Sequence, residues 1–149
     1  MGGEPWMYFV PYQEDVGKAL QELRQREFTA GRYYPAVMFL SDHLPIGTDS
    51  ESPGAQHSSI WEARTAAAET GTQSILDMES VSRAPGFFRV CPMDDEALEG
   101  CFGTTRPTHE MIANSLSYFD DIQRGQGVYT IVYKDGDPSE IMFAGYSFD

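Results

Sequence analysis

The feature that most constrains the fold is a pair of apolar runs near the C-terminus, joined by a short polar turn. Residues 128–134 and residues 140–148 are both rich in β-branched and aromatic side chains, and the sequence Asp-Gly-Asp-Pro lies between them. Asp-Gly between two apolar runs is a strong signal for a β-hairpin. The additional Pro138 predicts a loop longer than two residues.

The alternation of side chains along this hairpin also indicates what must cover it. Val128 and Val132 alternate with Tyr129 and Ile131, so neither face of the first strand is polar. A sheet with helices on one side usually has polar side chains on the other. We therefore expect a second layer over this face, either the long segment 32–58 of this chain or a partner. The tyrosines fit the second alternative, because an aromatic ring with a polar tip suits an interface.

The first part of the chain predicts a strand, a helix and a long connection. Residues 6–10 form a short apolar run typical of a buried strand. Residues 14–28 have apolar side chains at helical spacing, and Gly31 is the predicted stop. The segment 32–58 contains three prolines and predicts a long irregular connection, in which residues 36–40 are a candidate short strand.

The middle of the chain predicts a capped helix followed by a second hairpin. Ser59 and Glu62 match the capping box, in which each side chain binds a free backbone N–H group of the first turn. We therefore expect a helix over 59–70. Residues 74–81 alternate and residues 87–91 follow a Pro-Gly turn, so we expect the two segments to pair as antiparallel strands.

Two further helices are predicted before the C-terminal hairpin. The first opens at Asp94 and is closed by Gly100 or Gly103, and the second runs from Pro107 to Arg124. The apolar stripe of the second helix, which we expect to be buried, is Ile112, Leu116, Phe119 and Ile122.

This order of elements predicts an α+β fold. We expect a single-layer, mostly antiparallel sheet of about five strands, with helices packed on one face. The order of the first six elements also fits a ferredoxin-like (split βαβ) arrangement, to which the C-terminal hairpin would add one strand. At 149 residues the chain has the length of one domain, and we expect residues 1–149 to form it.

Charge excludes several classes of function. The chain has 10 Lys and Arg residues against 23 Asp and Glu residues, a net charge of -13. Such a chain repels phosphate groups, so we expect no binding to nucleic acid or to an anionic membrane. We find neither a transmembrane run nor a signal-peptide pattern, and Cys91 and Cys101 do not form a disulfide framework. We therefore expect a cytoplasmic protein with two reduced thiols.

No motif names a reaction, so we predict no catalytic residue, no metal site and no cofactor. The three histidines lack metal-ligand spacing, and the glycines form no nucleotide-binding loop. An alternative remains open: His57 precedes a helix and would meet His43 and Asp42 if the segment 32–58 folded back. In that case the chain would be a small-molecule-binding domain, or an enzyme with this segment as a lid.

The composition best fits a small acidic protein-binding module. Its expected partner is a basic protein, as for an inhibitor or an immunity-type protein, because opposite charges accelerate encounter. Acidity also has a simpler explanation, because it raises solubility. The apolar sheet face is compatible with a homo-oligomer as well. The acidic residues predicted to bind the partner are Asp94, Asp95, Glu96, Glu99, Asp120 and Asp121. The aromatic residues expected to anchor it are Tyr129, Tyr133 and Tyr146.

Overall fold

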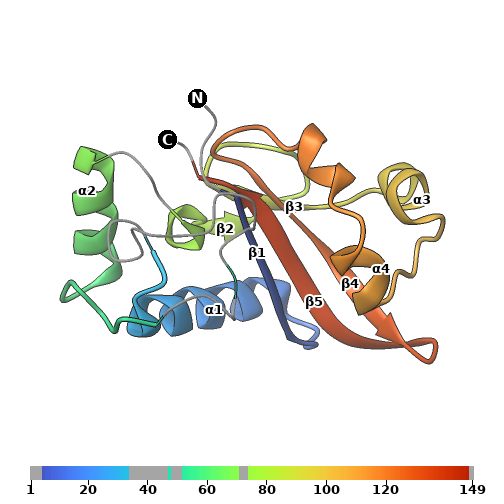
Figure 1. Ribbon diagram of the computed structural model, residues 1–149, viewed down its shortest axis with the longest axis horizontal. Helices are drawn as coiled ribbons and strands as arrows, with labels where there is room; N and C mark the ends of the chain where they lie inside the picture. The colour runs from blue at the N-terminus through green and yellow to red at the C-terminus, as the bar shows by residue number, and fades with distance from the viewer. Residues whose placement is uncertain (1–4, 34–46, 48–51, 71–73, 148–149) are drawn as a thin grey trace.

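The protein has an α+β fold built on one five-stranded mixed sheet (Figure 1). The computed structural model describes residues 5–33, 47, 52–70 and 74–147. The strands, in the sheet order β1-β5-β4-β3-β2, are β1 (Pro5–Pro11), β5 (Asp137–Tyr146), β4 (Gly127–Lys134), β3 (Arg89–Pro92) and β2 (Ser80–Val81). The helices are α1 (Val16–Ala30), α2 (Ile60–Thr70), α3 (Asp95–Phe102) and α4 (His109–Ala113), with the short 3-10 helices η1 (Ile75–Asp77) and η2 (Ser117–Asp121).

The sheet is mixed, which corrects the prediction of a mostly antiparallel one. β1, β5 and β4 pair antiparallel, whereas β4, β3 and β2 pair parallel. The predicted hairpin of residues 74–81 with residues 87–91 is therefore wrong, and the ferredoxin-like arrangement is not confirmed. The chain turns back through Gly86 and turns again at Phe88, whose φ is 60°. These two turns set β3 in the same direction as β2.

The C-terminal hairpin is confirmed, but its loop is shorter than predicted. Lys134 pairs with Asp137, so only Asp135 and Gly136 form the loop. Their φ values of 53° and 85° are those of a tight turn that matches the twist of the two strands. Pro138 is paired with Tyr133 of β4, and the register of the two strands shifts between Val132 and Tyr133. A β-bulge of this kind tolerates proline, which has no N–H group for the ladder.

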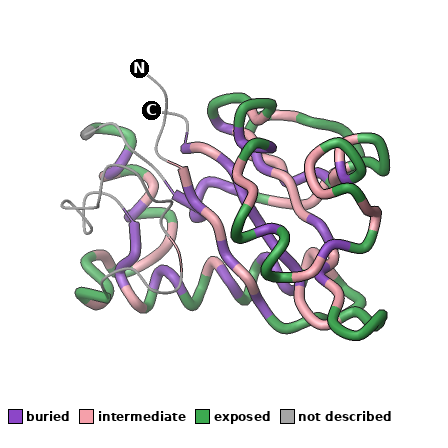
Figure 2. Tube along the Cα trace, turned by 45° about the vertical axis from the view of Figure 1, so that its right-hand side comes forward, coloured by how far each residue is buried: buried purple, intermediate pink, exposed green. Residues whose placement is uncertain are grey.

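One face of the sheet packs against α1. The even-numbered residues of β1 point to this side, and Figure 2 shows buried and exposed residues alternating along the helix that covers it. The fully buried centre includes Trp6, Tyr8, Leu20, Ile141 and Phe143. The chain just before α2 also reaches this side, because the Gly54 N–H group donates to the Ala30 carbonyl at the end of α1 (2.8 Å).

The opposite face of the sheet is covered by α3, α4 and η2, so helices do not lie on one face only. Ile112, Tyr118 and Phe119 pack here against Val132 and Met142. Among the described residues, this second layer is formed by residues 95–121. Most of the segment 32–58, the other predicted cover, lies outside the described residues. The apolar face that suggested a homo-oligomer is buried within this chain.

The first two helices are confirmed. Asp15 caps α1 by accepting the Lys18 N–H group (2.9 Å), and Gly31 ends it with a φ of 77°. Ser59 Oγ accepts the Glu62 N–H group at the start of α2 (3.1 Å). The Glu62 carboxylate reaches back one residue further than expected, to the amide and hydroxyl groups of Ser58. The candidate strand 36–40 lies outside the described residues.

The short helix after Asp94 is confirmed as α3, which ends at Gly103. The longer helix predicted from Pro107 to Arg124 is wrong: α4 stops at Ala113 and the chain resumes as η2. The residues between them are Asn, Ser and Leu, and Asn and Ser bind nearby backbone groups more readily than they continue a helix. The predicted stripe still faces inward, since Ile112 and Phe119 are buried and Leu116 and Ile122 are half-buried.

Candidate functional site

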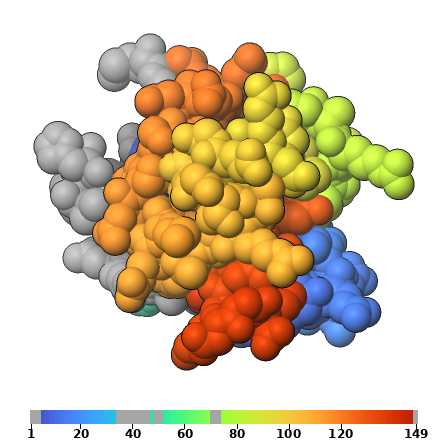
Figure 3. Space-filling view, turned by 90° about the vertical axis from the view of Figure 1, so that its right-hand side faces the viewer, coloured from blue at the N-terminus to red at the C-terminus, as the bar shows by residue number. Residues whose placement is uncertain are grey.

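Acidic side chains gather on the layer that covers the second face of the sheet. This layer, residues 93–126 with α3, α4 and η2, has seven acidic and two basic residues, and we call it the acidic layer. Figure 3 looks directly at it: α3 lies in the middle, and the tip of the C-terminal hairpin lies below. The seven acidic side chains, all exposed, are Asp94, Asp95, Glu96, Glu99, Glu110, Asp120 and Asp121.

The start of α3 explains why part of this charge is tolerated. Asp94 is the N-cap residue, and its carboxylate accepts the Ala97 N–H group at 2.8 Å. Asp95 and Glu96 lie in the first turn, where the helix dipole favours negative charge. Glu99 lies a turn further on, where this local stabilisation has faded. Helix capping therefore accounts for the first three carboxylates of α3 but not for Glu99.

The acidic layer and the α1 side differ in how their carboxylates are paired. On the α1 side, Glu27 pairs with Arg32, and Glu79 pairs with Arg64 and Arg89 at 3.3 Å each. Within the described residues, none of the seven carboxylates of the acidic layer has a basic side chain at ion-pair distance. The charge of the layer is therefore left to solvent or to a partner.

Arg106 and His109 of the acidic layer contact the sheet rather than the acidic side chains of the layer. The Arg106 guanidinium lies over the ring of Tyr133, 5.7 Å from its centre. His109 stacks on Phe9 of β1 with ring centres 3.8 Å apart, and its Nδ1 lies 2.9 Å from a carboxylate oxygen of Glu140 on β5. These contacts attach α4 to the sheet and leave the acidic side chains of the layer unneutralised.

The structure brings only some of the predicted anchor tyrosines to the acidic layer. Tyr146 packs edge-on against Phe119 (5.5 Å), and its pKa is raised by burial and further by the negative charge of Asp120. Tyr129 points to the opposite face of the sheet, where its ring lies 6.2 Å from that of Phe143. The three tyrosines therefore do not form one surface.

An apolar residue of the acidic layer was missed by the sequence analysis. Met111 on α4 is 44% exposed, and it is one of the few large apolar side chains with such exposure in the described chain. The signal was available: Met111 precedes Ile112 and so lies off the buried stripe of the predicted helix.

His57, the centre of the alternative ligand site, holds the start of α2 to the end of α1. Its Nδ1 lies 2.9 Å from the hydroxyl oxygen of Tyr33, which also accepts the Gln56 N–H group at 3.1 Å. His43 and Asp42, the other members of this predicted site, lie outside the described residues.

A small hollow lies beside Tyr33, between α2 and η1. Arg64, Ser74 and Asp77 line it together with small side chains, and it holds about 140 Å³ of space, part of it open solvent. Sites for drug-sized ligands are usually about 300–1,000 Å³. Asp77 within it is paired with Arg64 at 3.4 Å. This hollow is too small for such a ligand.

The remaining reactive groups do not form a site in the part of the chain that the structure describes. Cys91 and Cys101 are free, and the pKa of Cys91 is raised by burial and further by the charge of Asp94, which disfavours the thiolate. Among the described residues, no group of three His, Cys, Asp or Glu side chains is placed to hold a metal ion. The described helices are too short or too polar to cross a membrane.

Comparison with known protein families, with curated proteins and with solved structures found no match to this chain.

Proposed function

We propose that this chain is a protein-binding module whose acidic layer binds a basic surface of a partner protein. The observation that carries this proposal is the difference in pairing between the two sides of the sheet. On the α1 side Glu27 and Glu79 are paired with arginines, whereas the acidic layer exposes seven carboxylates without a basic neighbour among the described residues.

Unpaired, exposed carboxylates on one side of a molecule act mainly on the rate of encounter. A charged surface steers an oppositely charged partner, and the effect weakens beyond about 8 Å at physiological ionic strength. The net charge of -13 adds a long-range attraction of the same sign. An inhibitor or immunity-type protein that covers a basic toxin or nuclease is one instance of this class. We further infer a cytosolic location, because both cysteines are free thiols.

Affinity requires apolar area in addition to charge, since a few buried side chains usually carry most of the binding energy. Met111 is the exposed apolar side chain of the acidic layer, and methionine adapts readily to a partner surface. Tyr146 lies close to Asp120 and is half-buried, which suits a supporting contact. We therefore assign the anchor to Met111 and a supporting contact to Tyr146.

Capture of partners by two charge-reversed variants tests the proposal. Glu96→Lys with Glu99→Lys alters the acidic layer, and Glu14→Lys with Glu69→Lys makes the same change in net charge on the α1 side, at exposed residues. We expect a basic protein to be retained from extract by the wild type and by the α1-side variant, and to be lost with the α3 variant. Equal loss with both variants would show that net charge alone is responsible, and equal retention by both would contradict the proposed role of the acidic layer.

A further inference from the structure

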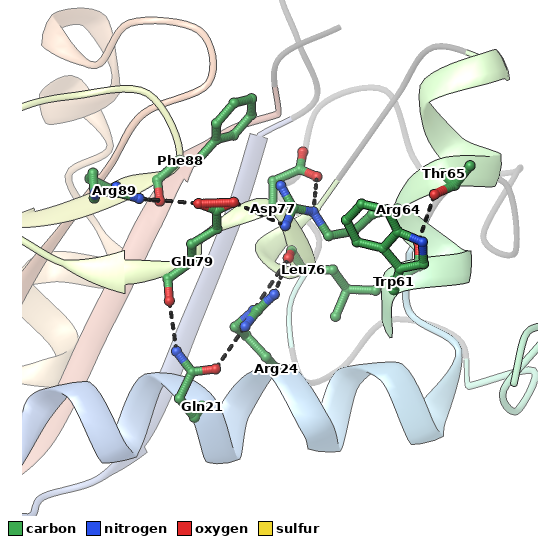
Figure 4. A network of polar contacts seen from close by, with 10 residues as sticks. All are labelled: Gln21, Arg24, Trp61, Arg64, Thr65, Leu76, Asp77, Glu79, Phe88 and Arg89. Atoms are coloured by element: carbon green, nitrogen blue, oxygen red, sulfur yellow. Dashed lines mark hydrogen bonds and ion pairs between the residues drawn. The ribbon is translucent and has the colours of Figure 1, made fainter. Parts of the chain in front are cut away.

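Two aromatic side chains on the other side of the molecule are unusually exposed. Trp61 on α2 is 75% exposed and Phe87, before β3, is 56% exposed. They are connected through two further residues: Arg64 follows Trp61 by one helical turn, its guanidinium lies 5.6 Å from the centre of the Phe88 ring, and that ring lies 6.5 Å from Phe87. Figure 4 shows Phe88, Arg64 and Trp61 in this order. We call these four residues the aromatic strip.

The backbone holds the aromatic strip in a conformation that is costly for a bulky residue. Phe88 has a φ of 60°, in the left-handed region that aromatic residues rarely adopt. It is fixed there by two backbone hydrogen bonds of 2.9 Å, from its own N–H group to Gly125 and from the Glu79 N–H group to its carbonyl. This turn places one ring under Arg64 and leaves the ring of Phe87 exposed. Such a fixed arrangement reduces the entropy that binding would cost.

Among the residues that the structure describes, arginines outnumber carboxylates around the aromatic strip. Arg64 pairs with Asp77 and Glu79, and Arg89 shares the same Glu79 carboxylate (Figure 4). A third arginine, Arg24, binds the Leu76 carbonyl oxygen rather than a carboxylate (2.7 and 3.2 Å). This network therefore contains three guanidinium groups and two carboxylates.

Two further observations support a local excess of positive charge. The pKa of Arg24 is lowered by burial and further by the nearby charge of Arg64. Arg83, exposed in the turn between β2 and β3, has no carboxylate at ion-pair distance among the described residues. The acidic neighbour on α2, Glu62, is turned away to Ser58. This patch is exceptional in a chain whose net charge is -13.

We propose that the aromatic strip is a docking surface for a peptide segment of a partner protein that carries carboxylates beside an apolar side chain. Trp61 and Phe87 supply apolar area of the kind that dominates protein interfaces. Arg83, which is exposed, and Arg89, whose side chain is 42% exposed, supply charge-assisted donors for carboxylates. The surface shares no residue with the acidic layer and prefers the opposite charge, so either proposal can fail alone.

Selection from a library of random 12-residue peptides displayed on phage tests this surface and requires no identified partner. We expect the selected sequences to be enriched in Asp and Glu next to an apolar residue. A synthetic peptide of the selected sequence should bind Trp61→Ala, Phe87→Ala and Arg83→Glu at least about tenfold more weakly than the wild type. All three side chains are exposed, so the variants should fold. Tyr12→Ala, at an exposed aromatic residue before α1 that belongs to neither surface, is the matched control with unchanged affinity.

Three results would overturn the proposal. The first is no enrichment, or enrichment of basic peptides. The second is binding that is unaffected by Trp61→Ala and Phe87→Ala. The third is a Trp61-dependent dimer in analytical ultracentrifugation without peptide, because the strip would then be covered by a second copy of this chain.

Discussion

Trp6 and Gly145 are paired across β1 and β5, and the indole of Trp6 lies directly over the bare Cα of Gly145. A Cβ atom added to Gly145 would lie 2.5 Å from Trp6 Cζ2, and one added to Gly127 on β4 would lie 2.8 Å from Trp6 Cη2. Two glycines on adjacent strands thus form the slot for a tryptophan that is fully buried. This contact connects three strands of the sheet.

Gly145→Ala should therefore lower the free energy of unfolding by about 1–3 kcal/mol, the range for overpacking in a core. Gly100→Ala is the control, because a Cβ there meets no atom within 4 Å and the residue lies exposed within α3. Alanine should stabilise that helix by about 0.5–1 kcal/mol. Denaturant unfolding of both variants checks this, and a Gly145→Ala protein as stable as the wild type would contradict the packing described.

A buried ion pair gives a second prediction. Glu27 is fully buried, and Arg32 donates to both of its carboxylate oxygens, from Nε at 2.8 Å and from Nη2. Arg32→Met should cost about 3–5 kcal/mol, because it leaves a buried carboxylate without its main partner. Arg26 contacts the same carboxylate at 3.3 Å from a more exposed position, so Arg26→Met should cost less than about 1 kcal/mol. Equal losses in thermal and denaturant unfolding would contradict this ranking.

The cap of α2 gives a third prediction, with a conservative control. Ser59→Ala removes the acceptor of the Glu62 N–H group and should lower stability by about 1 kcal/mol. Ser59→Asp retains an acceptor at the N-cap and should keep most of the stability. If the two variants unfold at the same denaturant concentration, the hydroxyl is not acting as a cap.

The elements confirmed from sequence are those with local signals. The Ser59 cap, the stop at Gly31 and the Asp135-Gly136 turn each determine backbone conformation within a few residues. The parallel pairing of β2 with β3 lacked such a signal. It depends on Phe88 in a left-handed conformation and on a backbone hydrogen bond to Gly125, far along the chain.

The candidate site also combines features that local sequence predicts with features that depend on the tertiary structure. The acidic residues were visible in the sequence, and capping chemistry placed Asp94 correctly at the start of α3. Tyr129 and Tyr146 point to opposite faces of the sheet. Strand alternation predicts this only when the register of β4 with β5 is known. Among the described residues, the acidic layer lacks ion pairs partly because Arg64 and Arg89 pair with Glu79 instead. Those pairings depend on the tertiary structure and could not be predicted from local sequence.

Alkaline pH should destabilise the protein. Burial raises the pKa of Tyr118 well above its ordinary value of 10.0, and burial also raises the pKa values of Tyr8, Tyr129 and Tyr146. The unfolded chain then loses phenol protons at a pH where the folded protein keeps them. Stability is therefore unaffected by these groups below pH 10 and falls as pH rises above it. Unfolding free energies measured between about pH 8 and about pH 11 check the sign, and Tyr118→Phe should reduce the slope.

Association kinetics with the basic protein retained by the wild type test the central claim most directly. We expect the association rate of the wild type and of the Glu14→Lys, Glu69→Lys control to fall steeply between low and physiological ionic strength. The Glu96→Lys, Glu99→Lys variant should associate more slowly at low salt and respond less to added salt. Association rates that are the same for all three proteins, or insensitive to salt, would contradict the proposed role of the acidic layer.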